Sequence, residues 1–349
     1  DVTPTILDLA GLEPDPSLPG HVLTNELPAG RSMVSTSYIP SLTFGWSPIW
    51  SLSANGEKFI LSPEKEYYEI SRDPGELENL AILQSERAQF LEGKLRSSAA
   101  TYIAGMHESQ ELGIESAGLA QLAALGYVAP TKLPTAIQLD AFVGREPKQM
   151  RAVMHLMHDF NSALTVSDFA SANRLIAQII TLDPDNLALD GMTSQLLLQE
   201  KRYQDLLDWQ KEQPAAFRES ATERYRRALA LSRTGREEEA IELLRKIKVD
   251  APSHVASRYE LALLLSTHGR TQQAMTEYEE VLELDPRNEA GLLNYANLLS
   301  KSGQTEKAAT ALETLIGYNP SYATAQRNLG LIYGKLGRNR EAMVQLEKY

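Results

Sequence analysis

The feature that most constrains this chain is a pattern of glycine, alanine and proline that recurs every 34 residues in its C-terminal half. Glycine stands at 235, 269, 303 and 337, alanine at 240, 274, 308 and 342, and proline at 252, 286 and 320. Glycine allows a tight turn, alanine lets two helices approach closely, and proline ends a helix because it lacks a backbone donor. The period therefore predicts stacked helix-turn-helix units that form an all-α solenoid.

Other places in the repeat follow the same register. With glycine at place 15, the frames run over 221–254, 255–288, 289–322 and 323–349. Place 8 is small and place 24 is large, as expected where two helices cross: Ala228, Ala262, Ala296 and Gly330 against Leu244, Tyr278, Leu312 and Leu346. The frame at 153–186 keeps Ala172 and Pro184, whereas 187–220 has only Leu206 and a displaced Pro214. We expect residues 147–349 to hold five complete units, one of them degenerate, and a truncated sixth.

These places resemble the tetratricopeptide repeat over about 200 residues, although Arg224, Arg258, Leu292 and Gln326 replace the family's Trp at place 4. The resemblance implies that places 2, 5, 9 and 12 of the first helices line a concave groove for a protein or peptide partner. It also allows oligomerisation through the repeats. The candidate groove residues are Tyr225, Tyr259, Leu263, Leu293, Asn297, Ser300, Arg327 and Asn328.

The same resemblance raises a narrower alternative, because some members of the family grip a peptide's terminal carboxylate with Lys and Asn side chains. Asn297 and Asn328 occupy two of the places used for this grip, but Leu293 stands where the Lys belongs. A chance occurrence of Asn on helix faces is the favoured interpretation. Tyr259, Leu263 and Leu293 favour an apolar or mixed extended peptide as the ligand.

The N-terminal region has a different periodicity. Residues 2–12 place apolar side chains on one helical face, with Pro4 in the first turn and Gly11 as the stop. Runs typical of strands follow at 33–38, 49–53, 58–61 and 66–70, with turn residues between them, and residues 76–104 read as a helix that covers one face of the resulting sheet. The sequence predicts a small α+β subdomain with an antiparallel sheet at 1–104, a helical or loop linker at 105–146, and the solenoid from 147 onward.

This region carries a second resemblance. The stretches at 1–12, 56–60 and 66–70, with Asp-Pro-Gly-Glu-Leu-Glu-Asn-Leu-Ala at 73–81, resemble the C-terminal part of sulfatases of the alkaline phosphatase superfamily. Residues 44–47 and 122–128 are similar to segments of bacterial sulfatase-like proteins that carry tetratricopeptide repeats behind the enzyme domain. The resemblance implies that 1–104 is an incomplete, non-catalytic subdomain of a sulfuric ester hydrolase. It further implies a divalent metal, calcium, in the intact parent, and an exported or periplasmic location.

The catalytic residues of that family have no counterpart in this chain. Its nucleophile is a formylglycine made from a Cys/Ser-x-Pro-x-Arg motif, and metal-bound Asp, Asn and His groups polarise the sulfate. The chain has no cysteine, and Ser17-Leu18-Pro19 is followed by Gly20-His21 instead of the Arg. We therefore predict no catalytic, cofactor-binding or metal-binding residues and an inactive chain. The alternative is a non-enzymatic tetratricopeptide scaffold whose sulfatase-like part is degenerate.

Two side-chain groups leave a choice between function and packing. His155, His158 and Asp159 are spaced to meet on one helix face and could bind a metal, but packing or a polar edge is the favoured interpretation. Phe44 and Trp46 belong to the densest aromatic cluster. They are candidates for the mouth of the parent's active site, with packing beneath the covering helix as the favoured alternative.

Charge and length limit the partner classes. The net charge of −12 and pI of about 5.1 argue against a nucleic-acid partner. Residues 1–130 hold 17 acidic and 7 basic side chains, which supports a domain boundary near 130.

No apolar run approaches the roughly 18 residues of a membrane helix. The start at Asp1 and the end at place 27 of the last frame lead us to expect a piece of a longer protein.

Overall fold

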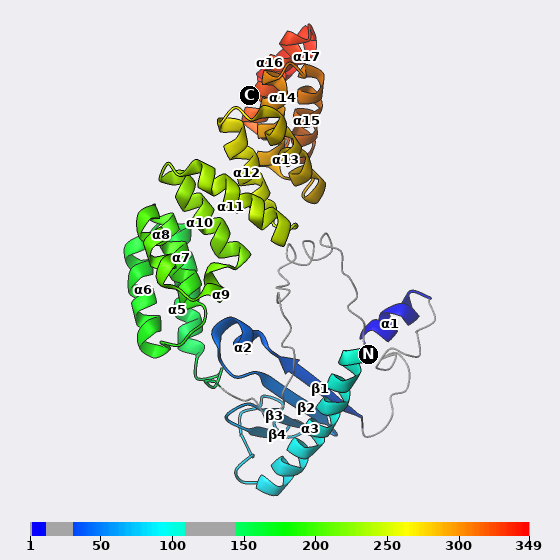
Figure 1. Cartoon of the computed structure of the whole chain (residues 1–349). Coiled ribbons are helices and arrows are strands. Elements are labelled where there is room, and N and C mark those ends of the chain that lie inside the picture. The colour runs from blue at the N-terminus through cyan, green and yellow to red at the C-terminus, as the bar shows by residue number, and fades with distance from the viewer. Residues whose placement is uncertain (1, 12–30, 109–143, 349) are drawn as a thin grey trace. The chain divides into compact units, whose positions relative to one another are not determined.

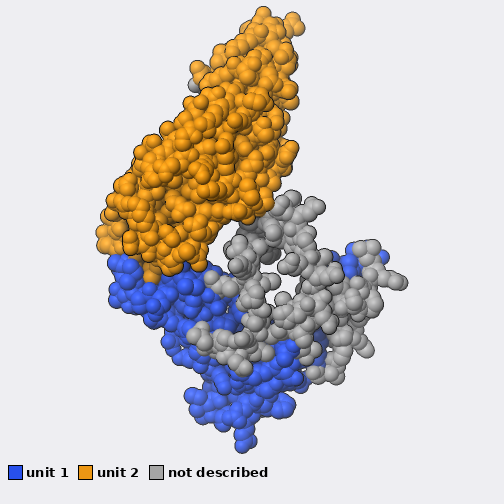
Figure 2. Space-filling model, in the orientation of Figure 1, with its two compact units in different colours: residues 1–112, 130–158, 177–188 blue, residues 113–129, 159–176, 189–349 orange. Residues whose placement is uncertain are grey.

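The computed structural model describes residues 2–11, 31–108 and 144–348. They divide into two compact units, shown in different colours in Figure 2. The first unit falls within 1–112, 130–158 and 177–188, and the second within 113–129, 159–176 and 189–349. The division passes through the first repeat rather than in front of it. The segment at 122–128 and the residues Ser17 to His21 lie outside the described residues.

The first unit is built on a four-stranded antiparallel sheet, as the sequence predicts. Its strands are β1 (Ser32–Ser37), β2 (Ile49–Ala54), β3 (Glu57–Leu61) and β4 (Glu66–Glu69), and they pair in chain order. In the register, Leu52 lies opposite Val34 on one side and Phe59 on the other. Asn55 and Gly56 have positive φ and form the tight β2–β3 turn that the sequence indicates.

Helix α3 (Ser85–Glu108) covers one face of this sheet (Figure 1). Its contribution to the core comes from small and branched residues one or two turns apart, which meet the inward side chains of β2, β3 and β4. The core consists of Trp50, Leu52, Phe59, Leu61, Tyr67, Ala88, Leu91, Leu95 and Ala99. The prediction of a helix that covers the sheet is confirmed.

The predicted start of this helix at residue 76 is wrong, because side chains capture the backbone donors that a helix would use. The Asp73 carboxylate accepts from the backbone nitrogens of Leu77 and Glu78, at 2.8 and 2.9 Å. Asn79 Oδ1 accepts from Tyr67 N and Ala81 N, which fastens the segment to β4. Glu76 adopts a positive φ of 54°. Local side-chain acceptors thus delay the helix to Ser85.

Two short helices lie on either side of β1 in the chain order. Helix α1 (Val2–Leu9) confirms the predicted N-terminal helix, and a turn with Gly11 at a φ of 71° follows it. Helix α2 (Ile39–Phe44) follows β1 and was not predicted from the sequence. It has Pro40 in its first turn, and Gly45 ends it with a φ of 75°.

The remaining described residues form a helical solenoid that takes up most of the chain (Figure 1). Its first helices, one per frame, are α5 (Arg151–Thr165), α7 (Leu189–Gln199), α10 (Ala221–Arg233), α12 (Val255–Thr267), α14 (Glu289–Lys301) and α16 (Ala323–Lys335). Its second helices are α6 (Phe169–Leu182), α8 (Tyr203–Glu212), α11 (Glu237–Asp250), α13 (Thr271–Leu284), α15 (Thr305–Tyr318) and α17 (Asn339–Lys348). A short helix, α9 (Ala215–Arg218), follows the displaced Pro214.

The recurring 34-residue spacing of glycine and alanine has the structural causes that the sequence suggests. The turn glycines at place 15 all have positive φ, between 72° and 84°. The alanines at place 8 are fully buried where α10, α12 and α14 cross their partners, and Leu244, Tyr278 and Leu312 fill the space beside them. At Gly330 an added Cβ would stand 2.7 Å from Leu346 Cγ. Small and large residues therefore alternate through one continuous core.

Candidate binding groove

Two of the groove residues predicted at place 5, Tyr225 and Tyr259, lie in an aromatic cluster near a buried carboxylate. The Tyr225 ring lies 5.3 Å from the His254 ring, and the Tyr259 ring lies 6.1 Å from the Tyr278 ring. Asn294 Nδ2 donates to the Tyr259 hydroxyl at 2.8 Å. Glu260, at place 6, is only 6% exposed. None of the residues that the structure describes gives its carboxylate a hydrogen bond or an ion pair.

Burial dominates the electrostatics of this cluster. It raises the pKa of Glu260, and the more distant Arg233 guanidinium only partly opposes the shift. It also raises the pKa of Tyr225 to about 12, with added repulsion from Glu260 and Tyr259. A second buried carboxylate, Glu223, is satisfied instead, because Ser194, Gln210 and Arg226 all donate to it. Of these two buried carboxylates, Glu260 is thus the one to which no described residue donates a hydrogen bond.

A hollow of about 660 Å³ lies further along the solenoid, where α14 and α16 meet. It brings together three predicted groove residues, Asn297, Ser300 and Asn328, and Asn328 Nδ2 donates to Asn297 Oδ1 at 2.9 Å. Its other lining residues are Lys301, Leu331, Ile332, Gly334 and Lys335. Ile332 is buried, whereas Leu331 is half exposed. The hollow therefore combines amide, cationic and apolar surface.

The other predicted groove residues do not line this hollow. Leu263 and Leu293 are half-buried, and Leu293 packs against the solenoid core. Arg327 is exposed on α16. The structure brings Tyr225 and Tyr259 together at one place and Asn297, Ser300 and Asn328 at another, and it leaves Leu263, Leu293 and Arg327 outside both.

Sequence reasoning named Asn328 at place 6 but missed the other residues there and all of place 13. Place 6 also supplies Glu260 and Asn294, and place 13 supplies Arg233, Lys301 and Lys335. The signal was available, because a basic residue at place 13 recurs in three of the four frames from 221 onward. The four places taken from the family pattern, 2, 5, 9 and 12, directed attention away from it.

The two other main hollows among the described residues have internally paired charges. One, of about 480 Å³, lies on the sheet between Arg31 and Glu76, and there Lys58 pairs with Glu76 at 2.6 Å. The other, of about 190 Å³, includes Arg236, which pairs with Glu239 at 2.7 Å. Most charges of these two hollows are paired, although Arg218 in the smaller one forms no ion pair with a described residue.

Phe44 and Trp46 lie in the first unit, where they join α2 to the turn after α6. Their ring centroids are 4.5 Å apart, and Trp46 is 2% exposed. Trp46 Nε1 donates to Asp183 Oδ2 at 2.6 Å, and the Arg145 guanidinium pairs with Asp183 at 2.9 Å. Packing thus describes the geometry of Trp46. The role of both rings beside a catalytic domain stays a prediction.

No metal site is found among the described residues, since no three His, Asp or Glu side chains of 2–11, 31–108 and 144–348 gather as ligands. His155 and His158 are exposed on α5. Across the same residues no helix is long and apolar enough to cross a membrane. The acidic run Glu237 to Glu239 opens α11, as the sequence indicates, and its members face Arg236, Arg270 and His268.

Comparison with known proteins identifies the repeats. Two family models described as tetratricopeptide repeat match residues 225–289 and 265–329. A search of curated proteins finds no match. A solved tetratricopeptide repeat protein from Parabacteroides merdae is 18% identical, with a TM-score of 0.43, and covers 57% of this chain and 78% of its own.

A solved MamA from Desulfovibrio magneticus RS-1 is 19% identical, with a TM-score of 0.42, over 46% of this chain and 90% of its own. A solved MamA from AMB-1 is 20% identical, with a TM-score of 0.41, over 45% of this chain and 92% of its own. These likenesses are too distant to carry an argument about activity. The family models, together with the observed helix pairs, establish that the C-terminal part of this chain is an array of tetratricopeptide repeats.

Proposed function

We propose that this chain is a protein-binding module in which the first helices of the repeats bind an extended segment of a partner protein. The observation that carries the proposal is the Asn297–Asn328 hollow, since repeating groove places line it and much of its surface remains open. The half-buried tyrosines at place 5 extend the same kind of surface to the neighbouring repeats. Extended peptides suit such a row, because regularly spaced pockets can take alternate side chains.

The test is direct peptide binding. We expect the purified chain to bind members of a panel of labelled extended peptides, measured by fluorescence anisotropy. Asn297→Ala combined with Asn328→Ala should weaken the bound peptides by about tenfold, a typical loss for two central contacts. Lys246→Ala is the matched control, because Lys246 is exposed on α11 and pairs with Glu242 at 3.1 Å. Equal binding by the double variant and the wild type would place the ligand elsewhere.

A second candidate function concerns residues 1–104. We propose that they serve as the non-catalytic C-terminal subdomain of a sulfatase-like hydrolase, with the repeats as its partner-binding arm. The support is that two of the stretches resembling sulfatases, 56–60 and 66–70, form the neighbouring strands β3 and β4 of one antiparallel sheet covered by α3. In this proposal the calcium, the formylglycine and the ester hydrolysis belong to the parent protein, which is exported or periplasmic.

This second candidate has its own test. The described residues hold no cluster of three metal ligands, and in this proposal the catalytic metal is bound by the parent's catalytic domain. The coding sequence upstream of Asp1 should encode a Cys/Ser-x-Pro-x-Arg motif with Asp and Asn metal ligands. If that motif is absent, the non-enzymatic scaffold is the better description. Metal-dependent cleavage of an aryl sulfate by the isolated chain would also contradict the proposal.

A further inference from the structure

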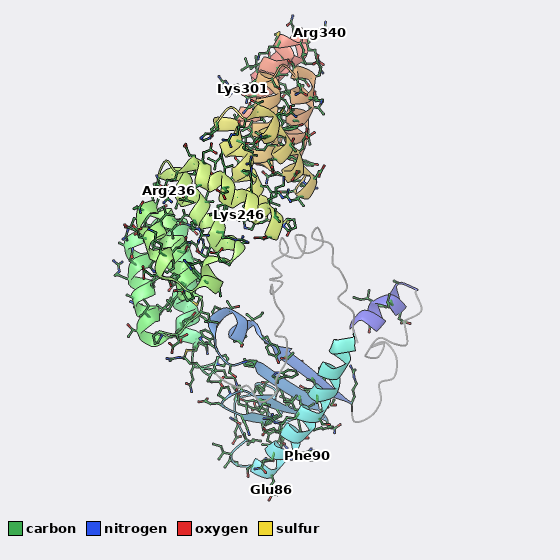
Figure 3. The ribbon with its side chains drawn as sticks, in the orientation of Figure 1. Glu86, Phe90, Arg236, Lys246, Lys301 and Arg340 are labelled. Carbon is green, nitrogen blue, oxygen red and sulfur yellow. The ribbon has the colours of Figure 1, made fainter. Side chains whose placement is uncertain are left out.

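The hollow between α14 and α16 carries positive charge that the protein itself does not neutralise. Lys301 and Lys335 occupy place 13 of adjacent frames, at the ends of α14 and α16, and both are exposed. Neither forms an ion pair or hydrogen bond with any residue that the structure describes. Figure 3 labels Lys301 on the solenoid. Although the chain has a net charge of −12, these two unpaired lysines give the hollow a positive electrostatic potential.

The hollow also has more hydrogen-bond donors than acceptors. The single bond from Asn328 Nδ2 to Asn297 Oδ1 leaves three amide hydrogens of this pair without a partner among the described residues. The count is the same if both amides are turned over. Ser300 adds a hydroxyl, and no Asp or Glu is among the lining residues. A ligand rich in acceptors and negative charge complements this surface.

Place 13 has an alternative role that must be separated from binding. A lysine in the last turn of a helix complements the negative end of the helix dipole, so Lys301 and Lys335 could serve α14 and α16 alone. That role does not explain the 660 Å³ hollow between them or the three free amide hydrogens of the asparagine pair. It also predicts a different effect of substitution, on helix stability instead of ligand affinity.

We infer that this hollow binds acidic side chains of an extended segment of a partner protein. The inference rests on the proposed function, of which it names the ligand class. Lys301 and Lys335 neutralise Asp or Glu carboxylates, the Asn297–Asn328 pair donates to their oxygens, and Leu331 contacts an intervening apolar side chain. We take the ligand group to be a side chain, since Leu293 stands where the family's grip on a chain terminus has a lysine.

The probe is a short labelled peptide in which Glu alternates with Leu, acetylated and amidated so that it carries no terminal charge. Its sister has Gln in place of Glu. We expect the wild-type chain to bind the Glu peptide about tenfold more tightly than the Gln peptide at low salt, and the difference to shrink as salt is added. Lys301→Gln combined with Lys335→Gln should abolish the difference.

The controls separate charge, fold and function. Lys307→Gln removes a lysine that is exposed on α15, outside the hollow, and should leave both affinities unchanged. Thermal unfolding of the Lys301→Gln, Lys335→Gln double variant should stay close to that of the wild type. Equal affinity for the two peptides would overturn the inference and leave the proposed function standing. A preference that survives the double variant, or a requirement for a free carboxyl terminus, would also overturn it, whereas binding to no extended peptide would contradict the proposed function.

Discussion

The turn position at place 15 shows how one residue determines the geometry of a repeat. Gly235, Gly269, Gly303 and Gly337 adopt positive φ there, and the same conformation occurs at Ser167 and Lys201 in the two earlier frames, with φ of 58° and 60°. A side chain in the left-handed region costs roughly 1 kcal/mol relative to glycine. The earlier repeats thus keep the turn without the residue that favours it.

This difference gives a prediction at two positions. Lys201→Gly should stabilise the solenoid by about 1 kcal/mol, because it relieves the strained conformation. Gly269→Ala should destabilise it by a similar amount, although no atom lies within 4 Å of the added Cβ. Thermal unfolding followed by circular dichroism measures both. Lys246→Gly on α11 is the contrasting control, since glycine inside a helix should destabilise. A loss of stability in Lys201→Gly would contradict the explanation.

Glu260 gives a second prediction at the residue scale. Burial raises its folded-state pKa above the ordinary 4.5, so the folded chain takes up a proton more readily than the unfolded chain. Protonation of Glu260 therefore stabilises the folded chain relative to the unfolded one. This stabilisation is fully present below pH 4.5, the ordinary pKa, and is lost as the pH rises through the folded-state pKa. Glu260→Gln removes this dependence. The stability of the wild type relative to Glu260→Gln should therefore increase as the pH falls from neutral toward 4.5, measured by urea unfolding. A constant difference would count against a raised pKa.

At the scale of a helix, place 34 acts as the N-cap of the next repeat. Ser220 accepts from Glu223 N at 3.3 Å, His254 Nδ1 from Ser257 N at 3.2 Å, and Asn288 Oδ1 from Gly291 N at 2.8 Å. Tyr322 at the equivalent place makes no side-chain cap. Three different side chains thus serve the same end of three consecutive helices.

The His254 cap depends on protonation. Burial lowers the pKa of His254 below 6.5, and protonation of Nδ1 would remove the acceptor that caps α12. The cap is intact above 6.5, and its contribution is lost as the pH falls through the folded pKa. His254→Asn keeps a capping acceptor, as in Asn288, but does not titrate. Wild type should lose about 1 kcal/mol relative to this variant between neutral and acidic pH, in the direction opposite to the Glu260 effect.

Place 4 explains how the repeats stack without the tryptophan of the family pattern. Arg258 Nε donates to Pro252 O at 2.9 Å, and Gln326 Nε2 donates to Pro320 O at 2.6 Å. Each side chain thereby fixes the preceding inter-repeat turn by hydrogen bonding instead of by aromatic packing. These two polar side chains keep a contact between neighbouring repeats, whereas Leu292 at the same place packs into the core.

At the scale of the molecule, periodic features could be predicted and non-local ones could not. The glycine, alanine and proline spacing predicts the helix pairs, and alternation predicts the sheet, because both signals are local. Helix α3 starts later than predicted because Asp73 and Asn79 accept hydrogen bonds from backbone N–H groups that a helix would otherwise use. The Lys301–Lys335 hollow arises from the meeting of two repeats. The hydrogen bond between Trp46 and Asp183 joins residues 137 positions apart, so no local sequence pattern predicts it.

The joint around Asp183 links the sheet subdomain to the first repeat within one compact unit. Asp183 is 1% exposed and accepts from Trp46 and Asn186, while Arg145 pairs with it. Gly144 makes the approach possible, since at a φ of 127° an added Cβ would stand 2.7 Å from the Trp46 backbone. Asp285 occupies the same place 31 and bonds Asn288 at 3.0 Å, but it has no such joint.

Comparing Asp183 with Asp285 separates the stability contributed by the Trp46–Asp183 contact from that of the bond within the inter-repeat turn, which both aspartates make. Asp183→Ala should destabilise the first unit by about 2 kcal/mol more than Asp285→Ala destabilises its repeat, because a buried indole donor loses its acceptor as well as the turn bond. Hydrogen exchange should show faster opening of both β1–β2 and the 177–188 segment in Asp183→Ala. Trp46→Phe should reproduce most of the effect without touching the turn. If Asp183→Ala and Asp285→Ala cost the same, or if only the turn opens, the sheet and the first repeat are not coupled through this carboxylate.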